Sequence, residues 1–70
     1  MVVLHVGDFI EAIRGFSIIR GVIEVIEKSW TGAEVISGKV KDHPFVADDF
    51  PFFISNDENS DEKWEITVIN

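Results

Sequence analysis

The sequence predicts an all-β protein, built as a small barrel or a curled antiparallel sheet of five or six short strands. The apolar residues fall in short runs separated by Gly, Pro and Asp breaks, which is the spacing of small β-domains. Six of the nine residues from 18 to 26 are Val or Ile, and β-branched side chains lose rotamer freedom in helices. Residues 64–69 alternate apolar and polar side chains, as a half-buried strand does.

The strand segments are, in chain order, residues 2–6, 9–14, 18–28, 34–41, 52–55 and 64–69. The breaks between them contain turn formers such as Gly7-Asp8 and Asp42-His43-Pro44. Gly38 lies in the middle of its run, where we expect a bulge. In the last run the apolar residues Trp64, Ile66 and Val68 share one face, and the polar residues between them share the other.

A helical interpretation of the first half competes with this one. Asp8 could cap a helix, with Glu11 completing a capping box. An apolar stripe with helical spacing follows it, formed by Ile18, Ile19, Val22, Ile23 and Ile26. Gly15 and Gly21 within the same span disfavour a helix. The alternative of an α+β protein with a helix within residues 9–28 therefore stays open at this stage.

The length and composition indicate a single globular domain over residues 1–70. Hydrophobic residues make up 46% of the chain and charged residues 27%, which is far from the composition of a disordered chain. A domain of this size buries only roughly 60% of its unfolded surface, and the absence of cysteine excludes disulfide staples. We therefore expect a homodimer.

The amino-terminal sequence favours a cytoplasmic protein that does not contact a membrane. It has no basic stretch of the kind that begins a signal peptide, and Asp8 and Glu11 come early. No apolar run approaches the ~18 residues that a membrane-spanning helix needs.

No residue pattern predicts an enzyme, a cofactor or a metal site. His5 and His43 lack the partner ligands of a metal centre, and none of the serines lies in a G-x-S-x-G motif. Asp57, Asn59 and Asp61 match the first half of a calcium loop, but the Gly and Glu that should follow are missing. The glycines form no phosphate-binding motif. We therefore predict a non-enzymatic protein without catalytic residues, cofactor or metal.

Negative charge is concentrated in the second half of the chain. The protein has 13 acidic and 6 basic residues, for a net charge of −7. Residues 1–35 hold five acids and three bases (5 − 3, net −2), whereas residues 36–70 hold eight acids and three bases (8 − 3, net −5). Such a surface repels nucleic acid and attracts basic proteins. Direct binding to nucleic acid is therefore disfavoured.

The acidic half also contains closely spaced aromatic residues, which suggests a surface for a partner. Carboxylates two residues apart on a strand lie roughly 6.6 Å apart, a spacing that resembles neighbouring phosphates. Because strand geometry sends adjacent side chains to opposite faces, one of Phe52 and Phe53 should pack inward and the other should stay exposed or lie at a subunit contact. The predicted partner-binding residues are Asp48, Asp49, Asp57, Glu58, Asp61, Glu62, Glu65, Phe52 and Phe53, with Glu24, Glu27, Glu34 and Asp42 as an extension.

Two resemblances add to these expectations. The stretches "VGDFIEAIRG" and "IRGVIEVI", within residues 4–27, resemble the start of small SH3-like or KOW-type barrels. This resemblance implies a barrel that binds RNA or protein through basic or aromatic loops, and the acidic loops of this chain argue against RNA. In size, acidity and lack of cysteine the whole chain is similar to small bacteriophage proteins that mimic DNA and inhibit host DNA-binding proteins. That similarity is compositional and assigns no individual residue.

The sequence thus leads to two main functional hypotheses, with a small hydrolase, which would need a deep pocket with convergent polar groups, as a less favoured third. The first is an acidic DNA mimic that binds a basic DNA-binding protein of the host, such as the nucleoid protein HU, and blocks its DNA binding. The second is a small SH3-like adaptor or structural module that docks on a protein partner, such as RNA polymerase, through its aromatic residues. A purely solubilising role of the acidic residues is the plainest alternative.

Overall fold

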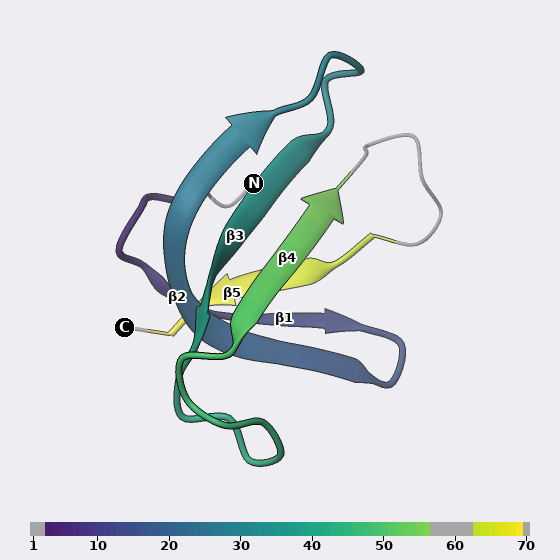
Figure 1. Cartoon of the computed structure of the whole chain (residues 1–70). Coiled ribbons are helices and arrows are strands. Elements are labelled where there is room, and N and C mark those ends of the chain that lie inside the picture. The colour runs from purple at the N-terminus through teal and green to yellow at the C-terminus, as the bar shows by residue number, and fades with distance from the viewer. Residues whose placement is uncertain (1–2, 57–62, 70) are drawn as a thin grey trace.

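The computed structural model of the protein describes residues 3–56 and 63–69. These residues form one antiparallel sheet of five strands and contain no helix (Figure 1). The strands are β1 (Phe9–Arg14), β2 (Ser17–Lys28), β3 (Glu34–Val40), β4 (Pro51–Asn56) and β5 (Glu65–Val68). Their order in the sheet is β4-β3-β2-β1-β5, so β4 and β5 are the two edge strands. The all-β prediction is confirmed.

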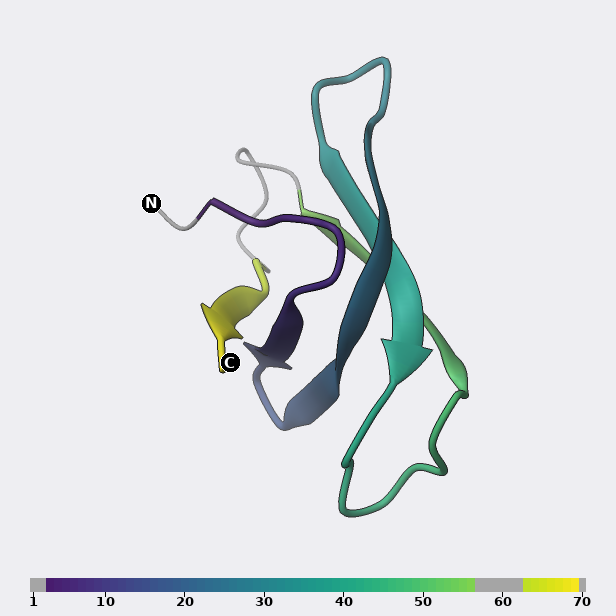
Figure 2. The same ribbon diagram turned by 90° about the vertical axis from the view of Figure 1, so that its left-hand side faces the viewer.

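The long strand β2 gives the sheet its curl. Its first half pairs with β1 and its second half with β3. The register shifts between Ile23 and Val25, which leaves Glu24 as an extra residue opposite β3. Such a bulge bends a strand and increases its twist, and β2 accordingly arches from the β1–β5 part of the sheet to the β3–β4 part (Figures 1 and 2). The strands β1 and β2 replace the alternative helix within residues 9–28.

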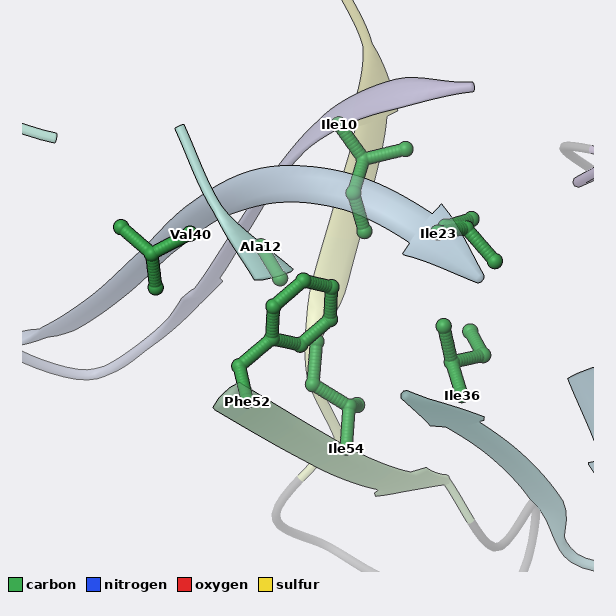
Figure 3. Close-up of a cluster of buried hydrophobic side chains, with 7 residues drawn as sticks. All are labelled: Ile10, Ala12, Ile23, Ile36, Val40, Phe52 and Ile54. Atoms are coloured by element: carbon green, nitrogen blue, oxygen red, sulfur yellow. The ribbon is translucent and has the colours of Figure 1, made fainter. Parts of the chain in front are cut away.

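The core lies on the concave face of this curled sheet. Every strand alternates inward and outward side chains, and the inward ones meet in one cluster (Figure 3). Its buried members are Ile10, Ala12, Ile23, Ile36, Val40, Phe52 and Ile54. Burying an isoleucine or phenylalanine side chain contributes roughly 1.5–3 kcal/mol, so these few residues are the main source of stability.

Two glycines allow the sheet to pack this closely. A side-chain carbon on Gly21 would collide with the Phe52 ring and with the β3 backbone around Val40. A side-chain carbon on Gly38 would collide with the backbone of Val22. Gly38 lies opposite Ile23, so the irregularity expected at Gly38 is found instead in β2, in the strand that faces it.

The strand predicted at residues 2–6 is wrong for the described residues 3–6, which form no strand. This segment ends in a turn, in which the Asp8 carboxylate accepts the His5 N–H at 2.9 Å and Gly7 has a positive φ of 96°. Leu4 still packs against the core. Val3 and Val6 are exposed, so the packing of Leu4 and the turn place this segment, and no strand in the described part of the chain pairs with it.

The other strand predictions agree with the structure to within one or two residues. Residues 9–14 form β1 as predicted, and β4 is longer than predicted by one residue at each end. Trp64, Ile66 and Val68 pack against the core from one face of the last segment, as the alternation predicted. The described part of the chain contains no helix that could cross a membrane.

Candidate interaction surface

The loop between β3 and β4, residues 41–50, carries the first two predicted acidic residues. Both Asp48 and Asp49 are exposed. The Lys41 Nζ lies 2.7 Å from the Asp49 Oδ1, and this hydrogen-bonded ion pair lowers the pKa of Asp49 and raises the pKa of Lys41. Lys39 also lowers the pKa of Asp49 by its charge. The negative charge of Asp49 is therefore largely compensated within the protein.

The second carboxylate of this loop stabilises the backbone. Asp48 accepts the Asp42 N–H at 3.1 Å through its Oδ1. Asp42 and Asp49 have φ values of 52° and 66°, a left-handed conformation that Asp adopts more readily than most residues. These aspartates thus have a local structural role: they shape the loop that joins the two strands.

His43 connects this loop to the start of β2. Its Nδ1 lies 3.0 Å and 3.1 Å from the backbone nitrogens of Phe45 and Val46 and accepts both N–H groups. Its Nε2 therefore carries the proton and donates to the Ile18 carbonyl oxygen at 3.0 Å. The ring thereby holds Ile18 and residues 43–46 together, although 25 positions separate Ile18 from His43 in the chain.

An apolar pocket of about 230 Å³ lies between this loop, β2 and β4. Its lining consists of apolar side chains and one histidine: Ile18, Ile19, Val40, His43, Val46, Phe50, Pro51, Phe52 and Phe53. Drug-sized ligands occupy pockets of roughly 300–1,000 Å³, so this pocket has room for about one bulky side chain. Its chemistry favours an apolar group.

Exposed aromatic rings lie at and beside the pocket. Phe50 and Phe53 are 60% and 65% exposed, and Phe45, whose ring packs edge-on against His43, is 89% exposed. Phe52 is only 7% exposed and belongs to the core. The prediction that one ring of the Phe52-Phe53 pair packs inward and the other stays exposed is therefore confirmed, with Phe53 as the exposed member.

The remaining predicted acidic residues do not join Asp48 and Asp49 in the described part of the chain. Glu65 lies on β5, opposite Ile13 of β1 and at the other edge of the sheet. Four predicted residues, Asp57, Glu58, Asp61 and Glu62, lie outside the described residues, as does the partial calcium pattern. A continuous row of carboxylates is therefore not seen in residues 3–56 and 63–69.

Of the predicted extension, Glu24 lies close enough to Lys41 to raise its pKa together with Asp49 and Asp48, whereas Glu27 and Glu34 lie toward the other end of β2 and β3. Glu24 and Glu27 are exposed on β2, whereas Glu34 begins β3 at the other end of the sheet from Asp42. Residues 3–56 and 63–69 contain no group of three or more His, Asp or Glu side chains that could hold a metal ion.

Sequence reasoning missed the pocket and the organising role of His43, which it had interpreted only as a turn residue. The pocket brings Ile18 and Ile19 next to residues about 21 to 35 positions away, and the pairing of β2 with β3 and of β3 with β4 creates this proximity. A local signal existed for one part of it. The cluster of Phe50, Pro51, Phe52 and Phe53 has more aromatic residues than one face of a short strand can bury.

Comparison of the chain with models of protein families, with curated proteins and with solved structures found no match.

Proposed function

We propose that this protein is a non-enzymatic binding module that docks on a protein partner through the pocket and the exposed rings around it. We call this surface, formed by the pocket with Phe45, Phe50 and Phe53, the aromatic surface. The observation that carries the proposal is the exposure of three phenylalanines in the β3–β4 loop and at the start of β4, where Phe50 and Phe53 line an apolar pocket. Such a surface is typical of an interaction site.

The charges near the aromatic surface suggest the character of the partner. The loop of residues 41–50 contains Asp42, Asp48 and Asp49 against the single Lys41 (1 − 3, net −2). A polar rim around an apolar centre is the usual anatomy of a protein interface. A partner with basic residues around an apolar anchor would match both features.

Affinity capture with matched variants tests this proposal. Tagged wild-type protein would be incubated with a lysate of the host cell, and the bound proteins would be compared after washes at low and high salt. We expect Phe50→Ala and Phe53→Ala to lose the partner, since their rings are exposed, whereas Asp57→Asn with Asp61→Asn should retain it. Phe52→Ala is unsuitable, because Phe52 is a core residue and its loss would test folding. The reverse pattern among these variants would contradict the proposal.

DNA mimicry is the second candidate, and one observation favours it. Residues 57–62 contain four acidic residues and no basic one (net −4), and they account for more than half of the net charge of the chain. In this candidate the acidic residues occupy the DNA-binding surface of a host protein such as HU. Binding would weaken with salt, because charges are screened over about 8 Å at physiological ionic strength. A titration against HU-like proteins in competition with DNA tests it, and failure to displace DNA at low salt would exclude it.

Self-association is a separate proposal. Eleven large apolar side chains are at least about one-third exposed among the described residues, and some of them, such as Phe16 and Trp30 in the β-hairpin turns, are not part of the pocket. A homodimer could cover these rings. Sedimentation velocity over a range of protein concentrations would detect the dimer, and a monomer at every concentration would exclude it.

The cytoplasm of the host remains our proposed compartment.

A further inference from the structure

The open edge of β4 shows how a partner could bind beside the pocket. Strand β4 pairs with β3 on one side only, and it ends the sheet. In an antiparallel pair, the N–H and C=O groups of successive residues point alternately to one neighbour and to the other. The Phe50 carbonyl accepts the Val40 N–H of β3 at 2.8 Å, so the even-numbered residues of β4 bond to β3. Phe53 and Ser55 therefore direct their N–H and C=O groups toward the open edge.

This edge has few of the features that usually prevent pairing with another chain. Natural edge strands carry charged residues, proline, bulges or covering segments. Residues 51–56 contain no charged side chain, and Pro51 removes only the first N–H of the strand. Within the part of the chain that the structure describes, β3 is the only strand that pairs with β4.

The pocket is lined in part by this edge strand. Its lining includes Pro51, Phe52 and Phe53 of β4 on one side and Ile18 and Ile19 of β2 on the other. A strand added along β4 would send every second side chain toward the concave face. One of these side chains would lie over the pocket, whose volume of about 230 Å³ fits a single bulky group.

We propose that β4 binds an extended segment of a protein partner, which adds to the sheet as a further strand and inserts one apolar side chain into the pocket. The inference rests on the proposed function and specifies its mode of recognition. In strand addition, main-chain hydrogen bonds supply affinity and pockets for alternate side chains supply specificity. Because the loop of residues 41–50 has a net charge of −2 and the whole chain a net charge of −7, the bound segment carries Lys or Arg beside its apolar anchor. A second copy of this acidic chain would meet like charge instead.

The test uses a displayed library of random linear dodecapeptides, selected against the full chain. We expect enriched peptides that share one bulky apolar residue with Lys or Arg close to it. Their affinity should fall about tenfold or more when N-methyl groups replace the amide hydrogens at the alternate positions that face β4, since each removes a main-chain hydrogen bond. N-methylation at the intervening positions is the matched control and should change little.

Protein variants locate the bound peptide. Val46→Trp should fill the pocket and abolish binding, whereas Trp30→Ala, in the β2–β3 turn at the opposite end of the sheet (Figure 1), should leave it unchanged. The absence of any enriched peptide would overturn the inference, and so would binding that tolerates both Val46→Trp and N-methylation at every position. Dimerisation that is lost in Phe53→Lys would also overturn it, because a second copy would then occupy the edge. The proposed function would survive these outcomes if Phe50→Ala still lost the captured partner.

Discussion

Gly21 shows how one residue couples the sheet to its core. The Phe52 ring passes so close to the β2 backbone that a methyl group at position 21 would collide with it and with β3. In the sequence this glycine was mainly an argument against a helix. Its structural role is to admit the largest core side chain.

We predict that Gly21→Ala destabilises the fold by about 1–3 kcal/mol, the typical cost of overpacking a core. Urea unfolding would measure the change in the free energy of unfolding. Glu27→Ala, at an exposed position of the same strand, serves as the control and should change it little. Equal stability of Gly21→Ala and the wild type would show that the core is looser than described.

The stabilising contribution of the Lys41–Asp49 ion pair should depend on pH. Asp49 has its pKa lowered from 3.8, so its stabilising contribution is present above pH 3.8 and is lost as the pH falls through the lowered pKa. Lys41 has its pKa raised from 10.5, so its contribution is present below pH 10.5 and is lost as the pH rises through the raised pKa. The pair is therefore fully formed between these two ends of the pH range.

NMR titration of the Asp49 carboxyl carbon would measure this effect. We expect the pKa of Asp49 to rise toward 3.8 in Lys41→Gln, because the main cause of its lowering is then removed. Lys28→Gln, at the far end of β2, should leave the pKa of Asp49 unchanged. An unchanged titration in Lys41→Gln would mean that the pair does not form in solution.

At the scale of elements, the β3–β4 loop is held in place by the His43 side chain. We predict that His43→Ala accelerates amide hydrogen exchange at Phe45 and Val46 by about tenfold, since both N–H groups lose their acceptor. His5→Ala, on an exposed side chain near the amino terminus, provides the comparison. If exchange at residues 45 and 46 did not change, another interaction would have to order the loop.

The sequence predicted most strands because each is a short β-branched or aromatic run between turn residues. Of the strand predicted at residues 2–6, the described residues 3–6 form none: their composition is equally favourable, but no strand in the described part of the chain pairs with them. Strand pairing is a property of the tertiary structure, so local propensity cannot decide it. The irregularity expected at Gly38 was displaced to β2 for the same reason.

The candidate surface was predicted only in part. The sequence singled out Phe53 and the neighbouring aspartates, and the structure places Phe53 at the pocket. The partners of these residues could not be found, because Ile18 and His43 come together through a tertiary hydrogen bond. The roles of Asp48 and Asp49 also differ from expectation, since one binds a lysine and the other a backbone N–H within the loop.

At the scale of the whole molecule, the two proposed functions differ in their dependence on salt. An apolar surface loses little affinity as salt rises, because the hydrophobic contribution does not depend on charge screening. A DNA mimic loses affinity steeply over the same range. We predict that partner binding persists from low to moderate salt, and isothermal titration at two ionic strengths would measure it. Loss of all binding at moderate salt would favour mimicry.

The most direct test of the central claim is site-specific photo-crosslinking. A benzoylphenylalanine would replace Phe50 beside the pocket in one variant and Trp30 in the β2–β3 turn in another, and both would be irradiated in a cell lysate. If the aromatic surface is the binding site, position 50 should give one dominant crosslinked protein, and position 30 should not crosslink to that protein. A dominant crosslinked protein from position 30, together with no crosslinked protein from position 50, would contradict the claim that the partner binds at the aromatic surface.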